Sequence, residues 1–195
     1  SYSYECLINY AGATVSWLNS NLEIIKKPEE TNAIFAKTKH SNGVIFIPAF
    51  VGLSSPHWLP TCKGMIYGLT PSVNKNHIIR SALESIAFQI KDYFDDLEKN
   101  QKIVCNDLYI DGGIVSNTSF MQFLANTLKR KIYVTNFKDM SSYGSLVMGL
   151  LGMKIKKNLK DISIYKQKYS AYLPNKNKFP DSYKEWKEVL KNFYL

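Results

Sequence analysis

The stretch of residues 108–124 constrains the fold of this chain more than any other part of the sequence. A short apolar run, Leu108–Ile110, is followed by Asp111 and two glycines, and then by apolar residues at the spacing of one helical face. Residues 116–118 (Ser-Asn-Thr) all carry side chains suited to the N-cap of that helix. The pattern therefore predicts a strand, a glycine turn and a helix.

Such a turn suits a phosphate. Glycines let the backbone approach a ligand that a Cβ atom would block, and a helix N-terminus presents unpaired N–H groups to an anion. A nucleotide phosphate is one interpretation of this turn. A glycine-rich strand-to-helix turn without any ligand is the other, and the turn motif taken alone favours this second interpretation.

The rest of the chain alternates between strand and helix patterns. The expected strands span residues 2–8, 44–47, 64–70 and 131–134, and the expected helices span 15–22, 33–37, 78–97, 141–151 and 182–194. This alternation indicates an α/β layer architecture. In the helix over 141–151, small residues lie between apolar ones, which predicts close packing against a sheet or another helix. Glu84 lies beside the apolar stripe of the longest helix, where a salt-bridged or partly solvated carboxylate is favoured over a catalytic one.

Composition excludes several classes of protein. At 195 residues and 45% hydrophobic content, the chain is long enough for one good core. No apolar run approaches the roughly 18 residues of a membrane span. The three cysteines and three histidines are scattered, so the pattern predicts neither a metal site nor a disulfide framework. We expect a reducing compartment, the cytoplasm.

The charge is concentrated near the C-terminus. The net charge is +9, and residues 154–195 alone hold eleven lysines against four acidic residues, which gives +7. A lysine-rich segment can contact nucleic acid or an anionic membrane. This one has no arginine and no recognition module, so a solvated surface is favoured and no nucleic-acid partner is expected. We expect residues 154–195 to form an extension that ends in an amphipathic helix and packs on the domain formed by residues 1–153.

Several collinear motifs resemble the FGGY carbohydrate kinases. The second signature of that family is matched at Gly64, Ile66, Gly68, Leu69, His77, Ile78 and Ser81–Glu84. Residues 11–18, 47–58, 76–89 and 111–124 further resemble the family members that phosphorylate glycerol. The resemblance covers roughly residues 2–150.

The resemblance implies two actin-like, ribonuclease-H-like domains with a cleft between them. This chain is identified as part of the C-terminal, ATP-binding domain: a mixed sheet flanked by helices, without its first strands. ATP and Mg²⁺ are the implied cofactors. A missing N-terminal domain supplies the glycerol site and the aspartate base, so the chain alone is expected to be inactive; a homo-oligomer is also expected. Another FGGY sugar or polyol kinase, and a non-catalytic nucleotide-binding scaffold, are the alternatives.

The resemblance also implies a nucleotide site, with no catalytic residue or metal ligand in this chain. Its residues are Gly12, Ser16, Asp111, Gly112, Gly113, Ile114 and Asn117. By position, Gly12 lines the site, Gly113 lies by the phosphates and Asn117 contacts the adenine end. Asp111 orients either the turn or the metal-bound phosphates, and a purely turn-stabilising role is the equal alternative.

Two of these positions differ from the family pattern. Ser16 stands where bacterial members carry glutamine, so a polar contact to the nucleotide is shorter or missing there. Ile114 follows the glycines where a smaller residue is common.

Overall fold

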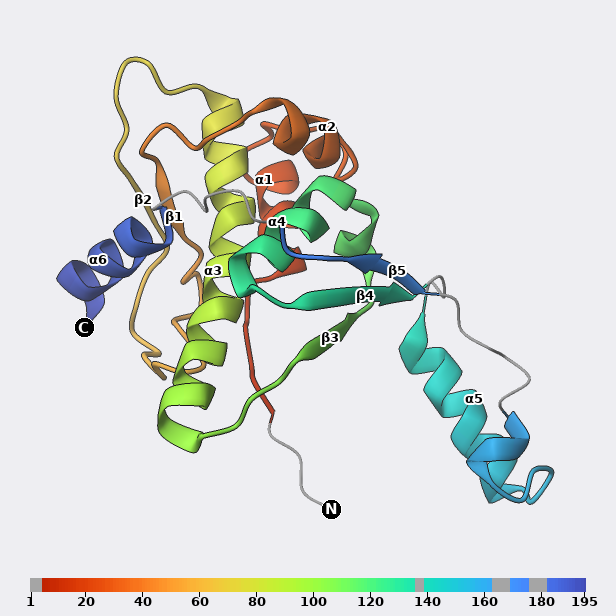
Figure 1. The fold of residues 1–195 in the computed structure, drawn as a ribbon. Helices are drawn as coiled ribbons and strands as arrows, with labels where there is room; N and C mark the ends of the chain where they lie inside the picture. The colour runs from red at the N-terminus through yellow and green to blue at the C-terminus, as the bar shows by residue number, and fades with distance from the viewer. Residues whose placement is uncertain (1–4, 136–138, 163–168, 176–181) are drawn as a thin grey trace.

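A computed structural model describes residues 5–135, 139–162, 169–175 and 182–195 of the chain. Its central element is helix α3, Lys75–Gln101, which runs through the middle of the molecule (Figure 1). The helix begins with a capping box. The Asn74 side chain accepts a hydrogen bond from the Asn76 N–H at 3.0 Å, and the Asn74 N–H donates to Nδ1 of His77 at 3.2 Å. The helix predicted over residues 78–97 is confirmed, and it extends beyond both predicted ends.

Four helices and a buried strand pack around α3. They are α1 (Gly12–Ser20), α2 (Glu30–Lys37), α4 (Thr118–Leu128), α6 (Ser182–Tyr194) and β1 (Ile45–Ile47). All three residues of β1 are buried, as its continuous apolar run predicts. Strand β2, Met65–Tyr67, pairs antiparallel with β1 and is shorter than the predicted strand over residues 64–70.

A second, mixed sheet stands beside this core. It contains β3 (Asp107–Ile110), β4 (Lys131–Thr135) and β5 (Tyr169–Tyr172) in the order β3-β4-β5. Strands β3 and β4 are parallel and are connected through α4, whereas β5 is antiparallel to β4. Side chains alternate across the strands, so Ile132 and Val134 are buried in the core while Tyr133 belongs to the opposite face.

Helix α6 fastens the C-terminal segment to the core. The Trp186 side chain is buried, and its Nε1–H donates a hydrogen bond to the Phe46 carbonyl of β1 at 3.2 Å. On α3, the buried Asp92 carboxylate is hydrogen-bonded to Nε2 of His57 at 2.7 Å and to Nζ of Lys187 on α6. This network joins the loop over residues 48–63 to two helices.

The carboxylate of Glu84 is also buried on α3. It accepts a hydrogen bond from Nε of Arg80 at 2.8 Å, which confirms the salt-bridged interpretation. Burial raises the pKa of Glu84, and the adjacent Arg80 guanidinium opposes that rise. Nη1 of Arg80 donates to the Phe35 carbonyl at 2.9 Å, so the pair also secures the end of α2.

Two predictions from the sequence are wrong. Of the strand expected over residues 2–8, residues 2–4 lie outside the described ranges, and residues 5–8 form no strand. Leu7 instead exchanges hydrogen bonds with Ser55 alone, donating to its Oγ and accepting from its N–H, both at 3.2 Å. Aromatic and apolar residues form a strand only where a neighbouring strand is present to pair with them. Here the loop over residues 48–63 provides a single pairing residue, Ser55.

The second wrong prediction concerns packing. Helix α5, Met140–Gly152, forms as expected, yet none of its residues is buried and it projects away from the core (Figure 1). A short 3₁₀ helix, Leu159–Ile162, lies against its far end. No described helix combines the length and apolar character that a membrane crossing requires.

Candidate functional site

One pocket of about 530 Å³ lies where three segments of the chain meet. They are the start of α1, the turn into α2, and the stretch from the end of β3 to the start of α4. The residues that line the pocket are Ala11, Gly12, Val15, Ser16, Pro28, Glu29, Thr31, Asn32, Asp111, Gly112, Gly113, Ile114, Ser116 and Asn117. The structure therefore brings together all seven residues that the sequence suggested for a nucleotide site.

Three glycines, Gly12, Gly112 and Gly113, line part of the pocket with backbone atoms alone. Gly112 has a φ of +98°, a conformation that L side chains rarely adopt. A Cβ atom built on Gly12, Gly112 or Gly113 would meet no protein atom within 4 Å. These glycines are therefore not required by close packing within the protein, and the space beside them is open to a ligand.

Three helix N-termini border the same pocket. Ala11, Glu29 and Asn117, the N-cap residues of α1, α2 and α4, all line it. The N–H groups at a helix start carry partial positive charge and attract anions. In α2, those of Glu30 and Thr31 already donate to the Lys27 and Pro28 carbonyls, so α2 contributes its dipole and not free donors. Among the described residues of the lining, Glu29 and Asp111 are the only charged side chains, so an anion in this pocket would be held by backbone dipoles.

Asn117 connects two walls of the pocket. Its buried side chain accepts a hydrogen bond from the Phe120 N–H at 2.9 Å, which caps α4, and its Nδ2 donates to Oγ1 of Thr31 at 3.4 Å. A 3₁₀ helix, Gly113–Ser116, precedes it, so the glycines do not lead directly into α4 as the sequence pattern indicated. The Asn117 amide still has a second N–H that can donate to a ligand.

Asp111 links the glycine turn to a distant element. Its Oδ2 accepts a hydrogen bond from the Met140 N–H at 3.3 Å, at the first residue of α5. The carboxylate therefore has a long-range contact beyond its own turn. Ser16 is exposed on α1, where its short side chain leaves the pocket open, and Ile114 packs against the core.

The turn into α2 is the part of the pocket that the sequence did not reveal. Residues 26–32 have the composition of a polar loop, and four of them line the pocket: Pro28, Glu29, Thr31 and Asn32. A proline followed by two glutamates indicates a helix start. The sequence near these residues does not indicate which distant residues lie beside the N-terminus of this helix. Among the described residues, no group of three or more His, Cys, Asp or Glu side chains could hold a metal ion.

Comparison with solved structures identifies the fold. The glycerol kinase of Plasmodium falciparum with ADP matches 95% of this chain and 37% of its own, with a TM-score of 0.80 and 33% sequence identity. The ligand-bound xylulose kinase of Lactobacillus acidophilus matches 93% of this chain and 36% of its own, with a TM-score of 0.70 and 19% identity. The fold is thus the actin-like ATPase fold of the carbohydrate kinases.

Sequence comparison identifies the family. A model of the C-terminal domain of the FGGY family of carbohydrate kinases matches residues 1–153, and the chain belongs to that family. The glycerol kinase of Shewanella amazonensis is 36% identical over 162 residues, 83% of this chain and 33% of its own length. Glycerol kinase 1 of Thermotoga maritima is 34% identical over 194 residues, 98% of this chain and 39% of its own. The chain thus spans between a third and two fifths of these relatives.

Proposed function

We propose that this chain is the ATP-binding C-terminal part of a glycerol kinase, which transfers the γ-phosphate of ATP to glycerol. The observation that carries the proposal is the pocket in which three helix N-termini and a glycine turn meet. Glycerol as the acceptor is supported by the names of the relatives at 34–36% identity and by the Plasmodium falciparum structure at 33%. The xylulose kinase, at 19% identity, supports the fold alone.

The pocket residues fit a nucleotide in distinct ways. Gly12 and Gly113 leave room for the ligand against the backbone, and Asn117 both caps α4 and offers an amide N–H to the adenine end. Asp111 holds the glycine turn against α5. Because the lining has two carboxylates and no basic side chain, we propose that Mg²⁺ accompanies the phosphates and lowers their charge. The bound nucleotide supplies the transferable phosphoryl group, and these residues bind and orient it.

Further proposals concern the organisation of the protein. We propose that residues 1–153 form the kinase domain and that residues 154–195 pack on it, because β5 adds to the sheet beside β4 and α6 lies on β1. The three cysteines Cys6, Cys62 and Cys105 are unpaired, in keeping with a cytoplasmic protein. A homo-oligomer remains a prediction.

Calorimetric titration of the chain with MgATP tests the proposed site. We expect wild-type binding and at least a tenfold loss of affinity in Gly113→Val, because the Cβ of the new side chain enters open space at the pocket, where it meets no protein atom within 4 Å. Asn117→Asp should also weaken binding while retaining the cap of α4, since aspartate caps helices as well as asparagine does.

A matched variant controls for the loss of a glycine. Gly149→Val introduces the same side chain on α5, outside the pocket lining, where a Cβ also meets no atom within 4 Å. Its affinity for MgATP should equal that of the wild type. Equal affinity in Gly113→Val would show that the nucleotide site is elsewhere. No binding by a folded wild-type chain would contradict the proposal that this pocket is sufficient to bind the nucleotide.

A further inference from the structure

Two buried polar side chains from distant parts of the chain meet in the wall of the proposed nucleotide pocket. Thr31 of α2 and Asn117, the N-cap of α4, are each 4% exposed, and both line the pocket. Nδ2 of Asn117 donates a hydrogen bond to Oγ1 of Thr31, with 3.4 Å between the two atoms. A polar side chain buried this deeply is held by its hydrogen-bond partners, so the partners determine which group it can offer to a ligand.

The hydrogen bonds around Asn117 have a fixed direction. The Phe120 N–H donates to Oδ1 of Asn117 at 2.9 Å, so the oxygen end of the amide faces the start of α4. The Thr31 hydroxyl donates to the Pro28 carbonyl at 2.6 Å, because a carbonyl oxygen can only accept. Oγ1 of Thr31 is therefore left to accept from Nδ2. A flipped amide would place two acceptors, Oδ1 and Oγ1, against each other.

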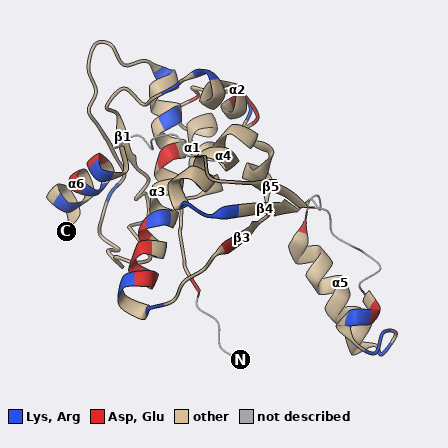
Figure 2. Cartoon of the chain, viewed as in Figure 1, with Lys and Arg blue, Asp and Glu red and all other residues tan. Residues whose placement is uncertain are grey.

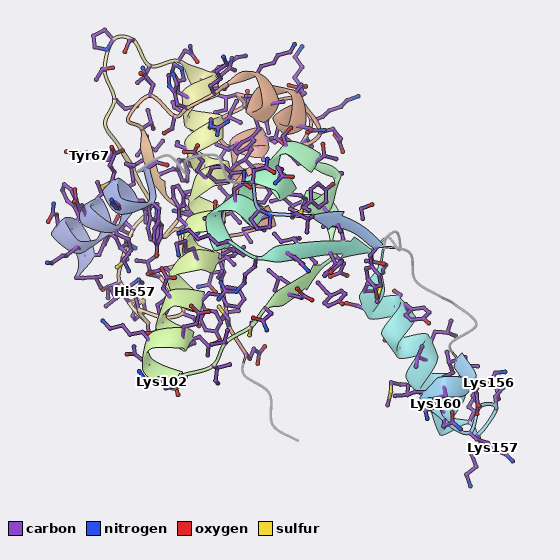
Figure 3. The ribbon with its side chains drawn as sticks, in the orientation of Figure 1. His57, Tyr67, Lys102, Lys156, Lys157 and Lys160 are labelled. Carbon is purple, nitrogen blue, oxygen red and sulfur yellow. The ribbon has the colours of Figure 1, made fainter. Side chains whose placement is uncertain are left out.

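The helix that begins after Asn117 is uncharged. Helix α4 contains no Lys, Arg, Asp or Glu, and it is tan over its whole length in Figure 2. Three lysines of the C-terminal segment, Lys156, Lys157 and Lys160, lie at the tip of the projecting arm, away from α2 and α4 (Figure 3). Neither α4 nor these lysines place a charge beside the amide, so its orientation depends on hydrogen bonds.

We infer that Thr31 is a positioning residue of the nucleotide site: its hydroxyl holds the Asn117 amide so that the remaining N–H, a donor and not an acceptor, is offered to the nucleotide. This inference rests on the proposed function, in which Asn117 faces the adenine end. The ring nitrogens of adenine include hydrogen-bond acceptors, which suit such a donor. Thr31 acts through Asn117 and need not contact the nucleotide itself.

Holding the amide before the nucleotide arrives strengthens binding. A side chain that is already fixed in its bound orientation loses less conformational freedom when the ligand binds. The packing of α2 on α4 does not require the hydroxyl, because Phe35 of α2 contacts Phe120 and Phe123 of α4 with ring centroids 6.0 and 5.3 Å apart. Removing the hydroxyl should therefore release the amide and leave the two helices together.

The orientation of the amide is tested without nucleotide. Nitrogen-15 NMR relaxation of the 195-residue chain reports the order parameter of Asn117 Nδ2, whose signal is identified by its absence in Asn117→Asp. The wild-type order parameter should be about 0.8, typical of a rigid group, and that of Thr31→Val should fall below about 0.6. Valine keeps the branched shape of threonine and lacks the hydroxyl. Thr31→Ser keeps the hydroxyl and should retain the wild-type value, and Thr31→Ala should repeat the effect of Thr31→Val.

Calorimetric titration with MgATP tests the effect on binding. Thr31→Val should weaken binding about fivefold, the order expected for one hydrogen bond, whereas Thr31→Ser should stay within about twofold of the wild type. Thr127→Val is the matched control. Thr127 is 1% exposed on α4, its hydroxyl donates to the Phe123 carbonyl at 2.7 Å, and it does not line the pocket. Its loss should leave the affinity for MgATP unchanged.

Three results would overturn the inference. They are an Asn117 amide that stays rigid in Thr31→Val, an unchanged affinity for MgATP in that variant, and an equal loss of affinity in Thr127→Val. Failure of the proposed function is a different result: a folded wild-type chain would then not bind MgATP at all. In that case the NMR comparison still decides whether Thr31 orients the amide, because it is made on the chain without nucleotide.

Discussion

At the scale of single residues, Asp92 shows how a charge is kept in the core of this protein. Burial by itself raises the pKa of this carboxyl group, but hydrogen bonds and charge from His57 and Lys187 more than offset that effect, so the pKa lies below its ordinary value. A depressed pKa in the folded state stabilises the fold at pH values above the unfolded pKa of about 4. That contribution is lost as the pH falls through the lower, folded-state pKa.

The variant Asp92→Asn should reveal this contribution. At pH 7 we expect the free energy of unfolding to fall by about 1.5–3 kcal/mol, the usual value of hydrogen bonds to a charged group. As the pH falls from about 4 through the lower folded-state pKa, the difference from the wild type should shrink, because the carboxylate becomes protonated first in the unfolded and then in the folded protein. Urea unfolding at several pH values measures both effects. Asp96→Asn, on the same helix, is the control, and an equal pH-dependent loss there would contradict this account.

At the scale of whole elements, α6 completes the core from the end of the chain. Its amphipathic pattern predicted a helix over residues 182–194, and the structure shows which side chain anchors it: Trp186, buried against β1. Lys184 and Lys191 are exposed, whereas Lys187 is half-buried and binds the Asp92 carboxylate of α3. Helix α6 is therefore part of the folded core, although it belongs to the lysine-rich segment of the chain.

Truncating the anchor should destabilise the fold far more than truncating its exposed neighbour. Trp186→Ala should lower the free energy of unfolding by about 3–5 kcal/mol, the usual cost of removing a large buried aromatic side chain. Phe193 is 57% exposed on the same helix, so Phe193→Ala should cost less than about 1 kcal/mol. Urea unfolding compares the two variants. Similar losses of unfolding free energy in the two variants would mean that burial of Trp186 is not the main contact that stabilises α6 on the core.

At the scale of the whole molecule, the proposed function gives the pocket one task in phosphoryl transfer, which is to hold the phosphoryl donor. The reaction needs an acceptor hydroxyl in line with the γ-phosphate and a carboxylate that takes its proton. In the described residues, the pocket lining offers carboxylates only at Glu29 and Asp111, and Asp111 is already bonded to α5. The chain covers about a third of the Shewanella amazonensis glycerol kinase. Under the proposed function, we therefore expect acceptor binding and base catalysis to come from outside this pocket.

The expected outcome is nucleotide binding without turnover. With MgATP and glycerol, the 195-residue chain alone should release no ADP above the rate of a buffer blank, as followed by a coupled assay. Glycerol-dependent turnover by the isolated chain would refute the assignment of roles.

Sequence alone determined the local elements and the family. The capping residues and the 3–4 spacing of α3, the apolar run of β1 and the glycine turn after β3 each follow from short-range chemistry, and all three elements are confirmed. The motifs also indicated the FGGY family, which the match over residues 1–153 confirms. The nucleotide roles of the seven pocket residues remain predictions, although they converge on one pocket.

Only the tertiary structure decided which segments meet. It brought the turn at Pro28–Asn32 to the glycine turn more than eighty residues later, and it paired Asp111 with Met140. It also left α5 uncovered, although the apolar and small residues of that helix predicted close packing. The reason is physical: a helix or turn forms from interactions within a few residues, whereas burial depends on which surfaces the folded chain places beside it.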